Sequence, residues 1–550
     1  MSPRTAVRSV LVACAFLVAG PFLRAQQATL PDAVRTAADR INAAQLGRDL
    51  EFLASDALKG RNTPSPGFDE AAAFIAKRLE RAGLKPAGDD GGFFQRYEMR
   101  ESRVDTAAAR LEIDGRAFAF GSDFVLRAFA APVDGTYPVV YVGHGWTVPD
   151  RGVDPFGGLD VKGKVVLAHG PRALPKDVEI RQIGRVTPGA SSVAVEAARR
   201  GAAAVVYIPQ AQALEGWEQM RTQNLVRREM EPSVPSAYAA QPLTSVMLSR
   251  AAVDALFAGE KVNGEEVVRR EEARDYPSSF QLQRTLALRV PAASTLAHRP
   301  YNVVAILEGT DPELRSEYIT VESHLDGAVG TREVNGDAIY NSADDNASGS
   351  AATLAIAEEM ARARPKRSIV FIWDSGEEQG LWGTRWFVHQ PPVPLERIVA
   401  HFNIDMIGAN RAAGSPDADE TRVTGANEVF LIGPAALSAS VDALLERVNR
   451  SYLNMQFNRQ HDRPDSEFFY PRTDAGPFLE RGILTIGFTT GIHNRYHLPT
   501  DEARTLDPKK METIARTVFA SIWMLADSPD RPRIDKGVPA TVPRYGSATR

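Results

Sequence analysis

The sequence predicts an α/β protein, in which a mixed, mostly parallel sheet is sandwiched by helices and a small β-rich region is inserted. Three observations support this prediction. From residue 301 onward, near-continuous apolar runs alternate with helical patterns, as expected for strands buried on both faces of a sheet. Between 115 and 290 the runs become short and β-rich. The chain of 550 residues is also long enough for more than one hydrophobic core.

The first 25 residues have the features of a secretory signal peptide. Arg4 and Arg8 give a positive start, an apolar run follows, and Ala25 provides a small residue for cleavage. A Gly-Pro pair breaks this short run, which disfavours a membrane anchor, and we expect no stable membrane span elsewhere. Cleavage would remove Cys14, the one cysteine, so we expect a secreted or periplasmic protein without disulfides or cysteine-bound metal.

The composition is that of an ordinary globular protein, with 44% hydrophobic and 24% charged residues. The formal net charge is −5. Proteins that bind nucleic acid need a basic surface to contact phosphates, so this charge disfavours nucleic acid as a partner.

Helical patterns dominate the region that follows the signal peptide. Apolar residues recur at helical spacing over 35–60, and a loop rich in turn residues occupies 60–67. A second helix is predicted over 68–83, where Gly83 suits the C-terminal cap.

The β-rich region 115–290 contains a predicted strand–helix–strand unit, with strands at 163–168 and 202–208 around a helix at 191–200. It holds neither paired carboxylates nor a histidine cluster. Its isolated His144 and His169 are interpreted as structural. We therefore interpret this region as a non-catalytic insert.

The α/β pattern begins at residue 301 and ends near 526. Strands are predicted at 302–307, 318–321, 368–373, 398–406, 428–432 and 483–488. Helices are predicted at 348–362, 381–388, 436–452, 475–480 and 508–525. A surface loop is predicted over 412–426, and the Pro- and Arg-rich segment 527–550 is predicted to be a flexible tail.

Potential metal ligands follow several of these strands. His324 comes after 318–321, Glu378 after 368–373, and Asp405 lies at the end of a third strand. His497 lies in the loop after 483–488, and Asp345 precedes the helix that starts near 348. Ligand sites of open α/β sheets lie at the carboxyl ends of the strands, so these five side chains can converge on one point.

Two histidines and three carboxylates suit zinc. Five ligands are too many for one open catalytic site, but they suit two metals if one carboxylate bridges. Two metals ~3.5–4 Å apart can hold a water and lower its pKa from ~15.7 toward ~7. Glu377 can then accept the proton and pass it to a leaving group. Asp326, two residues after His324, can orient that imidazole through its second nitrogen.

The motifs HLDG, SADDNASG, DSGEEQGLWGT, NIDMIG and YHLPTD occur in this order. As a set they resemble the clan of secreted di-zinc aminopeptidases and glutamate carboxypeptidases, peptidase family twenty-eight. The resemblance covers most of 40–110 and 300–526. It implies the zinc exopeptidase fold, with a catalytic domain formed by 36–114 and 291–526. The region 115–290 resembles the protease-associated domain inserted in many relatives.

The resemblance also implies a role for each matched residue. It implies two Zn²⁺ ions: His324 and Asp405 on one, Glu378 and His497 on the other, and Asp345 as the bridge. It implies that Glu377 is the general base, Asp326 the carboxylate behind His324, and Tyr496 a group that stabilises the oxyanion. The Asp345-Asn346 peptide matches a position where the family has a cis bond. The implied activity is removal of N-terminal residues from peptide substrates.

Several alternatives remain open. His493 competes with His497 as the last ligand, although the following Leu-Pro-Thr-Asp favours His497. The same site could serve a dipeptidase or a carboxypeptidase. A glutaminyl cyclase uses one zinc, and a catalytically dead binding protein would have lost ligands, so the intact set of five disfavours both. The oligomeric state and the preferred side chain are not determined by the sequence.

Overall fold

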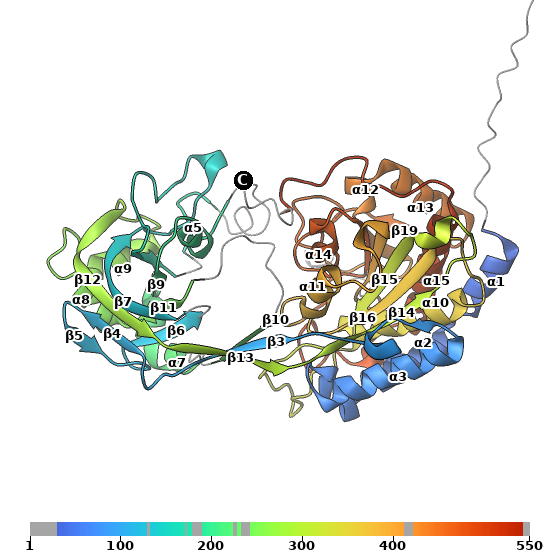
Figure 1. The fold of residues 1–550 in the computed structure, drawn as a ribbon, viewed down its shortest axis with the longest axis horizontal. Helices are drawn as coiled ribbons and strands as arrows, with labels where there is room; N and C mark the ends of the chain where they lie inside the picture. Colours follow the sequence, from blue (N-terminus) through green and yellow to red (C-terminus); the bar gives the residue numbers. More distant parts are fainter. Residues whose placement is uncertain are drawn as a thin grey trace, which may run out of the picture.

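The computed structural model describes residues 30–128, 132–170, 173–178, 190–223, 228–232, 243–411 and 422–542. Their chain forms two bodies joined by a narrow ribbon of strands (Figure 1). The α/β body comprises the described residues of 30–98 and 299–542, and the second body those of 105–223 and 243–291. The predicted signal peptide and most of the loop predicted over 412–426 lie outside the described residues.

Within the described residues, the sheet of the α/β body has nine strands in the order β1-β14-β16-β15-β17-β20-β18-β19, with β2 also paired to β14. Strands β16, β15, β17 and β20 are parallel, whereas β14 and β18 are antiparallel to β16 and β20. This mixed sheet confirms the predicted α/β class. The strands are β1 (Lys85–Pro86), β2 (Phe94–Arg96), β14 (Tyr301–Leu307), β15 (Tyr318–His324), β16 (Ser368–Asp374), β17 (Ile398–Ile404), β18 (Glu428–Ile432), β19 (Gln456–Asn458) and β20 (Leu484–Thr489).

Helices cover both faces of this sheet (Figure 1). Along β16, Phe371 and Trp373 join the core beneath one layer of helices, whereas Val370 and Ile372 join the opposite core. Burial on both faces explains why this strand is a continuous apolar run in the sequence. The first layer contains α1 (Asp32–Arg40), α2 (Ala43–Leu53), α3 (Pro66–Ala82), α10 (Gly349–Met360), α13 (Ala439–Ser451) and α15 (Pro508–Asp527). The opposite layer contains α11 (Trp382–His389) and α14 (Ala475–Glu480), and α12 (Pro434–Leu437) precedes α13.

The second body has its own sheet, which runs β5-β4-β12-β7-β8-β9-β11-β6 in the described residues. It begins at Arg110, ahead of the expected boundary at 115, and ends at Val290. Strands β8 and β9 are parallel and are joined through α5, as in the predicted strand–helix–strand unit. The strands are β4 (Arg110–Ile113), β5 (Arg116–Phe118), β6 (Phe124–Ala128), β7 (Val133–Tyr141), β8 (Val165–His169), β9 (Ala204–Ile208), β11 (Ser245–Leu248) and β12 (Phe280–Val290). The helices are α5 (Val193–Arg199), α6 (Ala211–Glu215), α7 (Trp217–Gln223), α8 (Arg250–Leu256) and α9 (Gly264–Glu272).

The ribbon between the bodies consists of β3 (Met99–Val104), β10 (Arg228–Pro232) and β13 (Ala292–His298), all antiparallel. Its foot packs on the α/β body, where Met99 lies in a small apolar cluster with Trp382 and Trp386 of α11. The ribbon therefore contacts the helix that follows Glu377 and Glu378.

Two expectations differ from the structure. The helical pattern over 35–60 forms α1, α2 and a short 3₁₀ segment (Asp56–Arg61), because the Asn42 side chain accepts from the Gln45 amide and starts a new helix. The flexible tail expected over 527–550 is wrong for its described part. Asp535 accepts from the first-turn amide of Ala439, and Val542 is 3% exposed in the core.

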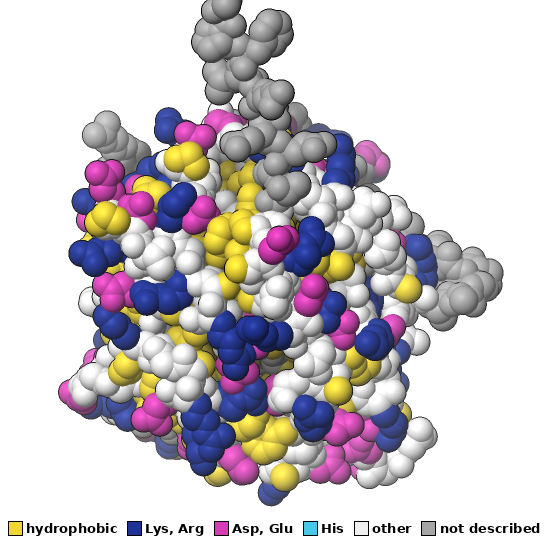
Figure 2. Space-filling model, turned by 90° about the vertical axis from the view of Figure 1, so that its right-hand side faces the viewer, with side chains coloured by type: hydrophobic (Ala, Val, Ile, Leu, Met, Phe, Trp, Pro, Cys, Tyr) yellow, Lys and Arg dark blue, Asp and Glu magenta, His cyan; other side chains and the backbone are white. Residues whose placement is uncertain are grey.

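The face of the α/β body turned away from the second body carries Lys and Arg side chains interspersed with Asp and Glu (Figure 2). Charges of both signs therefore share this surface. Among the described residues, no helix combines the length and apolarity that crossing a bilayer requires.

Candidate metal centre

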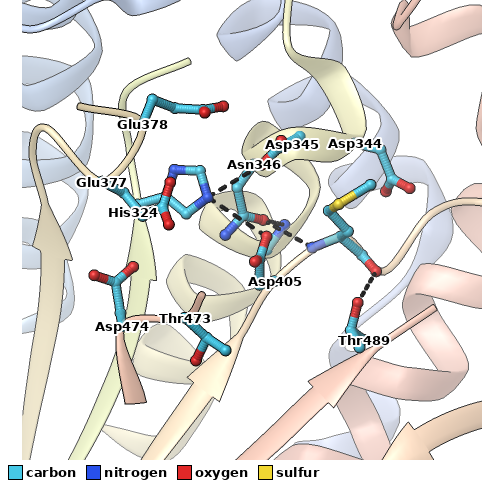
Figure 3. A network of polar contacts seen from close by, with 12 residues as sticks. His324, Asp344, Asp345, Asn346, Glu377, Glu378, Asp405, Thr473, Asp474 and Thr489 are labelled. Carbon is cyan, nitrogen blue, oxygen red and sulfur yellow. Dashed lines mark hydrogen bonds and ion pairs between the residues drawn. The ribbon is translucent and has the colours of Figure 1, made fainter. Parts of the chain in front are cut away.

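The five predicted ligands meet at the carboxyl edge of the parallel strands. Figure 3 shows four of them, His324, Asp345, Glu378 and Asp405. His324 is the last residue of β15, and Asp405 directly follows β17. Glu378 lies in the turn between β16 and α11, Asp345 precedes α10, and His497 lies in the loop after β20. Parallel strands end at the same edge of a sheet, which is why residues from five distant segments meet here.

The first group of ligands comprises His324, Asp345 and Asp405. The Nε2 atom of His324 lies 3.2 Å from Oδ1 of Asp345 and 3.5 Å from Oδ1 of Asp405. All three side chains offer a ligand atom within one small space.

The second group comprises Asp345, Glu378 and His497. The Nε2 atom of His497 lies 3.1 Å from Oδ2 of Asp345 and 2.9 Å from Oε2 of Glu378. Asp345 therefore presents one carboxylate oxygen to each group, which is the arrangement that a bridging ligand requires.

Unpartnered atoms show that these residues fit metal ions. Nε2 of His324, Oδ1 of Asp405 and Oε1 of Glu378 are buried and make no hydrogen bond. Buried polar atoms without a partner are costly, and one cation in each group would give these atoms a partner. Imidazole nitrogens and carboxylate oxygens are ligands that zinc accepts.

Burial and ion pairing shift the pKa values of this centre. Burial raises the pKa of Glu378 to about 8. Burial opposes protonation of His497, but hydrogen bonds to Asp345 and Glu378 outweigh it and raise its pKa to about 10. The same balance, with Asp345 and Asp405 as partners, raises the pKa of His324 well above its usual value. Protons therefore compete with metal for these ligands, and acid weakens metal binding.

Glu377 lies beside the ligands and lines the same pocket as Asp345 and Asp405. Its main-chain N–H donates to Oδ1 of Asp326, 3.2 Å away. Burial raises the pKa of Glu377 well above its usual value. A protonatable carboxyl in this place is suited to accept a proton from a nucleophile.

Asp326 acts differently from the expectation. The Nδ1 atom of His324 lies 3.1 Å from the main-chain oxygen of Asp326, whereas the carboxylate is 4.0 Å away. The carboxylate instead accepts the Glu377 amide. The main-chain oxygen of Asp326 thus orients the His324 imidazole, and its side chain orients the loop that carries Glu377.

His493 and His497, the two competing histidines, have separate places. His493 Nε2 lies 3.3 Å from Oδ2 of Asp344 and 3.8 Å from Asp501, and it joins neither ligand group. The Asp501 carboxylate accepts the main-chain amides of Asp344 and Asp345. These residues support the segment that carries the bridge, which also contains the cis Asp345–Asn346 peptide.

The sequence reasoning missed Arg61, which is fully buried. Its guanidinium donates to the main-chain oxygens of Leu325, Asn341 and Ser342 at 2.9–3.0 Å, and also to that of Leu53. Burial lowers the pKa of Arg61 to about 10, although nearby carboxylates counteract this shift. Gly60 and Arg61 belong to the loop predicted over 60–67, and no local pattern signals that the Arg61 side chain folds inward.

A second missed feature is a buried carboxyl cluster formed by Glu322, Asp374 and Asp474. The hydroxyl of Thr384 donates to Asp374, 3.0 Å away, and to Asp474. Burial raises the pKa values of Glu322 and Asp474 well above their usual range. Asp474 is drawn below Glu377 in Figure 3.

Tyr496, the expected oxyanion group, lines the pocket with Glu377 and Asp405. Its ring stacks on the His497 ring with centroids 3.7 Å apart, and its hydroxyl accepts from Arg472 at 2.8 Å. The pocket wall beyond it is largely apolar and includes Met406, Ile432, Phe468, Phe469, Phe488 and Ile492.

Comparisons with known proteins identify several relatives of this chain. Residues 302–522 match the model of peptidase family M28. An aminopeptidase of Pseudomonas aeruginosa (strain UCBPP-PA14) is 31% identical over 204 residues, which cover 37% of this chain and 32% of that protein. A probable zinc metalloprotease of Leptosphaeria maculans is 26% identical over 273 residues, which cover 44% of this chain and 62% of that protein. The chain thus spans about a third of the length of the first of these relatives.

Among solved structures, the aminopeptidase from Aneurinibacillus sp. strain AM-1 has a similar fold. The TM-score is 0.50 and the sequence identity 17%, with 91% of this chain and all of that chain covered. The family match covers the strands and loops that carry all five ligands and Glu377. Residues 302–522 of the chain, which carry this centre, are thus similar to peptidase family M28.

Proposed function

We propose that this protein is a di-zinc exopeptidase that removes N-terminal residues from peptides. The observation that carries the proposal is the carboxylate of Asp345, whose two oxygens each face a separate histidine–carboxylate group. The names of its relatives, aminopeptidase and zinc metalloprotease, support the choice of metal and reaction. The intact set of five ligands argues against a one-zinc cyclase and against a dead binding protein.

The residues of this centre would divide into metal ligands and a proton acceptor. His324 and Asp405 would hold one zinc, Glu378 and His497 the other, and Asp345 would bridge them. When bound, the zinc pair supplies Lewis acidity that polarises the scissile carbonyl and acidifies the attacking water. Glu377 accepts the proton of that water and returns it to the departing amine, so a single carboxylate serves as base and then as acid.

Tyr496 would stabilise the negative charge that develops on the carbonyl oxygen. Its phenol lines the pocket that also contains Glu377 and Asp405. A donor fixed beside the reacting carbonyl contributes mainly in the transition state, because the oxygen becomes a stronger acceptor there. We therefore expect Tyr496 to affect turnover more than substrate binding.

Substrate panels test the proposed specificity. An aminopeptidase should cleave aminoacyl-p-nitroanilides and should lose this activity when the substrate amine is acetylated. N-blocked dipeptides with a free carboxylate test the carboxypeptidase alternative. The dipeptidase alternative predicts that free dipeptides are cleaved and that longer peptides are not. Cleavage of blocked substrates at the carboxyl end, without any release of N-terminal residues, would contradict the aminopeptidase assignment.

We also propose that the protein is secreted or periplasmic after cleavage near Ala25. The positive start and the apolar run of the first 25 residues support this location. Mass spectrometry of the N-terminus in the exported fraction should find a chain that lacks this segment. An intact N-terminus found in the cytosol alone would contradict the proposal.

For the second body we propose the role of a non-catalytic, protease-associated insert.

A further inference from the structure

Arg472 and Tyr496 form a polar pair in the lining of the pocket beside the ligands. Nη2 of Arg472 donates to the Tyr496 hydroxyl oxygen, 2.8 Å away. The guanidinium carbon lies 5.8 Å from the centre of the Tyr496 ring, and the same ring stacks on the ring of His497. The pair is thus connected directly to a metal-ligand candidate.

The hydrogen-bonding capacities of the two groups fix the direction of this bond. A guanidinium can only donate, so the phenol oxygen must be the acceptor. The phenolic proton then needs a different acceptor. Among the described residues, the Tyr496 hydroxyl makes no second hydrogen bond. Its proton is therefore available to an acceptor that enters the pocket.

The bond from a charged donor also changes the strength of the phenol as a donor. Hydrogen bonds from ionised groups are stronger than neutral ones, and hydrogen bonds in series polarise one another. By donating to the phenol oxygen, Arg472 makes the phenolic proton a better donor toward a third group.

The other partner of Arg472 does not account for its position. Nη1 of Arg472 lies 3.4 Å from Oε2 of Glu467, whose side chain is 47% exposed. Exposed ion pairs of this kind contribute little to stability. The shorter contact, with Tyr496, is therefore the one that constrains the Arg472 side chain in the pocket.

We propose that Arg472 is a positioning residue, which holds the Tyr496 phenol with its proton directed at the substrate carbonyl oxygen. The inference rests on the proposed peptidase function. Arg472 itself need not touch the substrate. It acts through Tyr496 by filling the acceptor side of the hydroxyl and by polarising its O–H bond.

A double-mutant cycle tests this role. Tyr496→Phe should lower kcat about 100-fold, the size expected for the loss of one oxyanion donor. Arg472→Met should lower kcat about tenfold and change KM less than about twofold, because the phenol remains but is no longer held or polarised. The double variant should be no slower than Tyr496→Phe alone, since Arg472 has nothing to position without the hydroxyl. Arg472→Lys should recover part of the loss.

Binding of a tetrahedral phosphonate peptide analogue gives a second readout that is independent of turnover. Calorimetry should find weaker binding to Arg472→Met and Tyr496→Phe, because the phosphonate oxygen resembles the oxyanion. Zinc content and melting temperature should match the wild type. The matched control is Arg463→Met, which removes an arginine that is 60% exposed and pairs with Asp465 at the surface. It should leave kcat, KM and phosphonate affinity unchanged.

Three results would overturn the inference. The losses of the two single variants could add in the double variant, which would mean that Arg472 acts independently of Tyr496. Arg472→Met could raise KM only for substrates with an acidic side chain, which would make Arg472 a substrate contact. Phosphonate affinity could also be insensitive to both changes. A zinc-loaded wild type that cleaves no peptide substrate would instead overturn the proposed function, and the inference would fall with it.

Discussion

The two bodies of this chain both end a parallel strand with a histidine, yet the two histidines have opposite surroundings. His324 ends β15 and faces the carboxylates of Asp345 and Asp405. His169 ends β8 in the second body, where its Nε2 pairs with the Tyr141 hydroxyl at 3.0 Å. Among the described residues, every group of potential metal ligands lies in the α/β body.

The difference shows that a histidine at a strand end indicates a metal site only where carboxylates converge on it. In the α/β body, ion pairs hold the His324 pKa well above its usual value. In the second body, burial lowers the pKa of His169 to about 3, so its imidazole is neutral. We therefore place the proposed chemistry in the α/β body and expect variants of the two bodies to behave differently.

The largest expected contrast is between Asp345→Asn and Asp123→Asn. Asp345→Asn removes the charge that both metal groups share, so each zinc should bind more weakly and turnover should fall to background. Asp123→Asn changes an aspartate of the second body that accepts the Ala119 amide, and it should leave turnover unchanged. Elemental analysis and nitroanilide assays measure both. An Asp345→Asn protein that retains two zinc ions per chain would argue against bridging.

Glu377→Gln should separate catalysis from metal binding. We expect this variant to keep its zinc but to lose about 10²–10⁴ in kcat, because the amide cannot accept the proton of the attacking water. Glu271→Gln is the matched control, since Glu271 is a buried glutamate of the second body that pairs with Gln210. Equal turnover of Glu377→Gln and wild type would refute the assignment of the base.

Arg61→Met tests the support behind the ligand loops. The substitution removes the buried guanidinium that donates to four main-chain oxygens, so the free energy of unfolding should fall by about 3 kcal/mol. Zinc affinity should fall about tenfold, as for other residues that support ligands. Arg367→Met should destabilise the protein similarly, because Arg367 is also fully buried, but should not change zinc affinity. Equal zinc affinities in the two variants would limit Arg61 to a structural role.

The smallest effect is expected in the second body. His169→Gln should cost about 1–2 kcal/mol of stability at pH 7 through its bond to Tyr141, without changing kcat or zinc content. The folded-state pKa of His169 lies near 3 and the unfolded value near ~6.5, so the unfolded chain binds the extra proton. Stability is therefore lost as the pH falls from ~6.5 toward 3, and the variant should lose less over this range. A fall in kcat of His169→Gln would show that the second body contributes to catalysis and would contradict this prediction.

The fold class and the central strands, with the motifs that follow them, could be predicted from the sequence, because apolar runs and turn residues are local signals. It was insufficient for contacts that depend on packing between distant segments. Arg61 folds inward to reach the main chain near Leu325 and Asn341, and nothing around Gly60-Arg61 indicates this. The cluster of Glu322, Asp374 and Asp474 joins two strands and a helix start, so spacing along the chain cannot reveal it. The described tail was missed because its composition resembles disorder, although Val542 is buried.

The most direct test of the account is a zinc titration of the wild-type protein, with bound metal and hydrolysis of an aminoacyl-p-nitroanilide measured on the same samples. The account predicts two zinc ions per chain, loss of activity as a chelator removes them, and recovery as zinc is returned. Activity that persists after complete removal of metal, or a fully active protein that binds a single zinc, would contradict it.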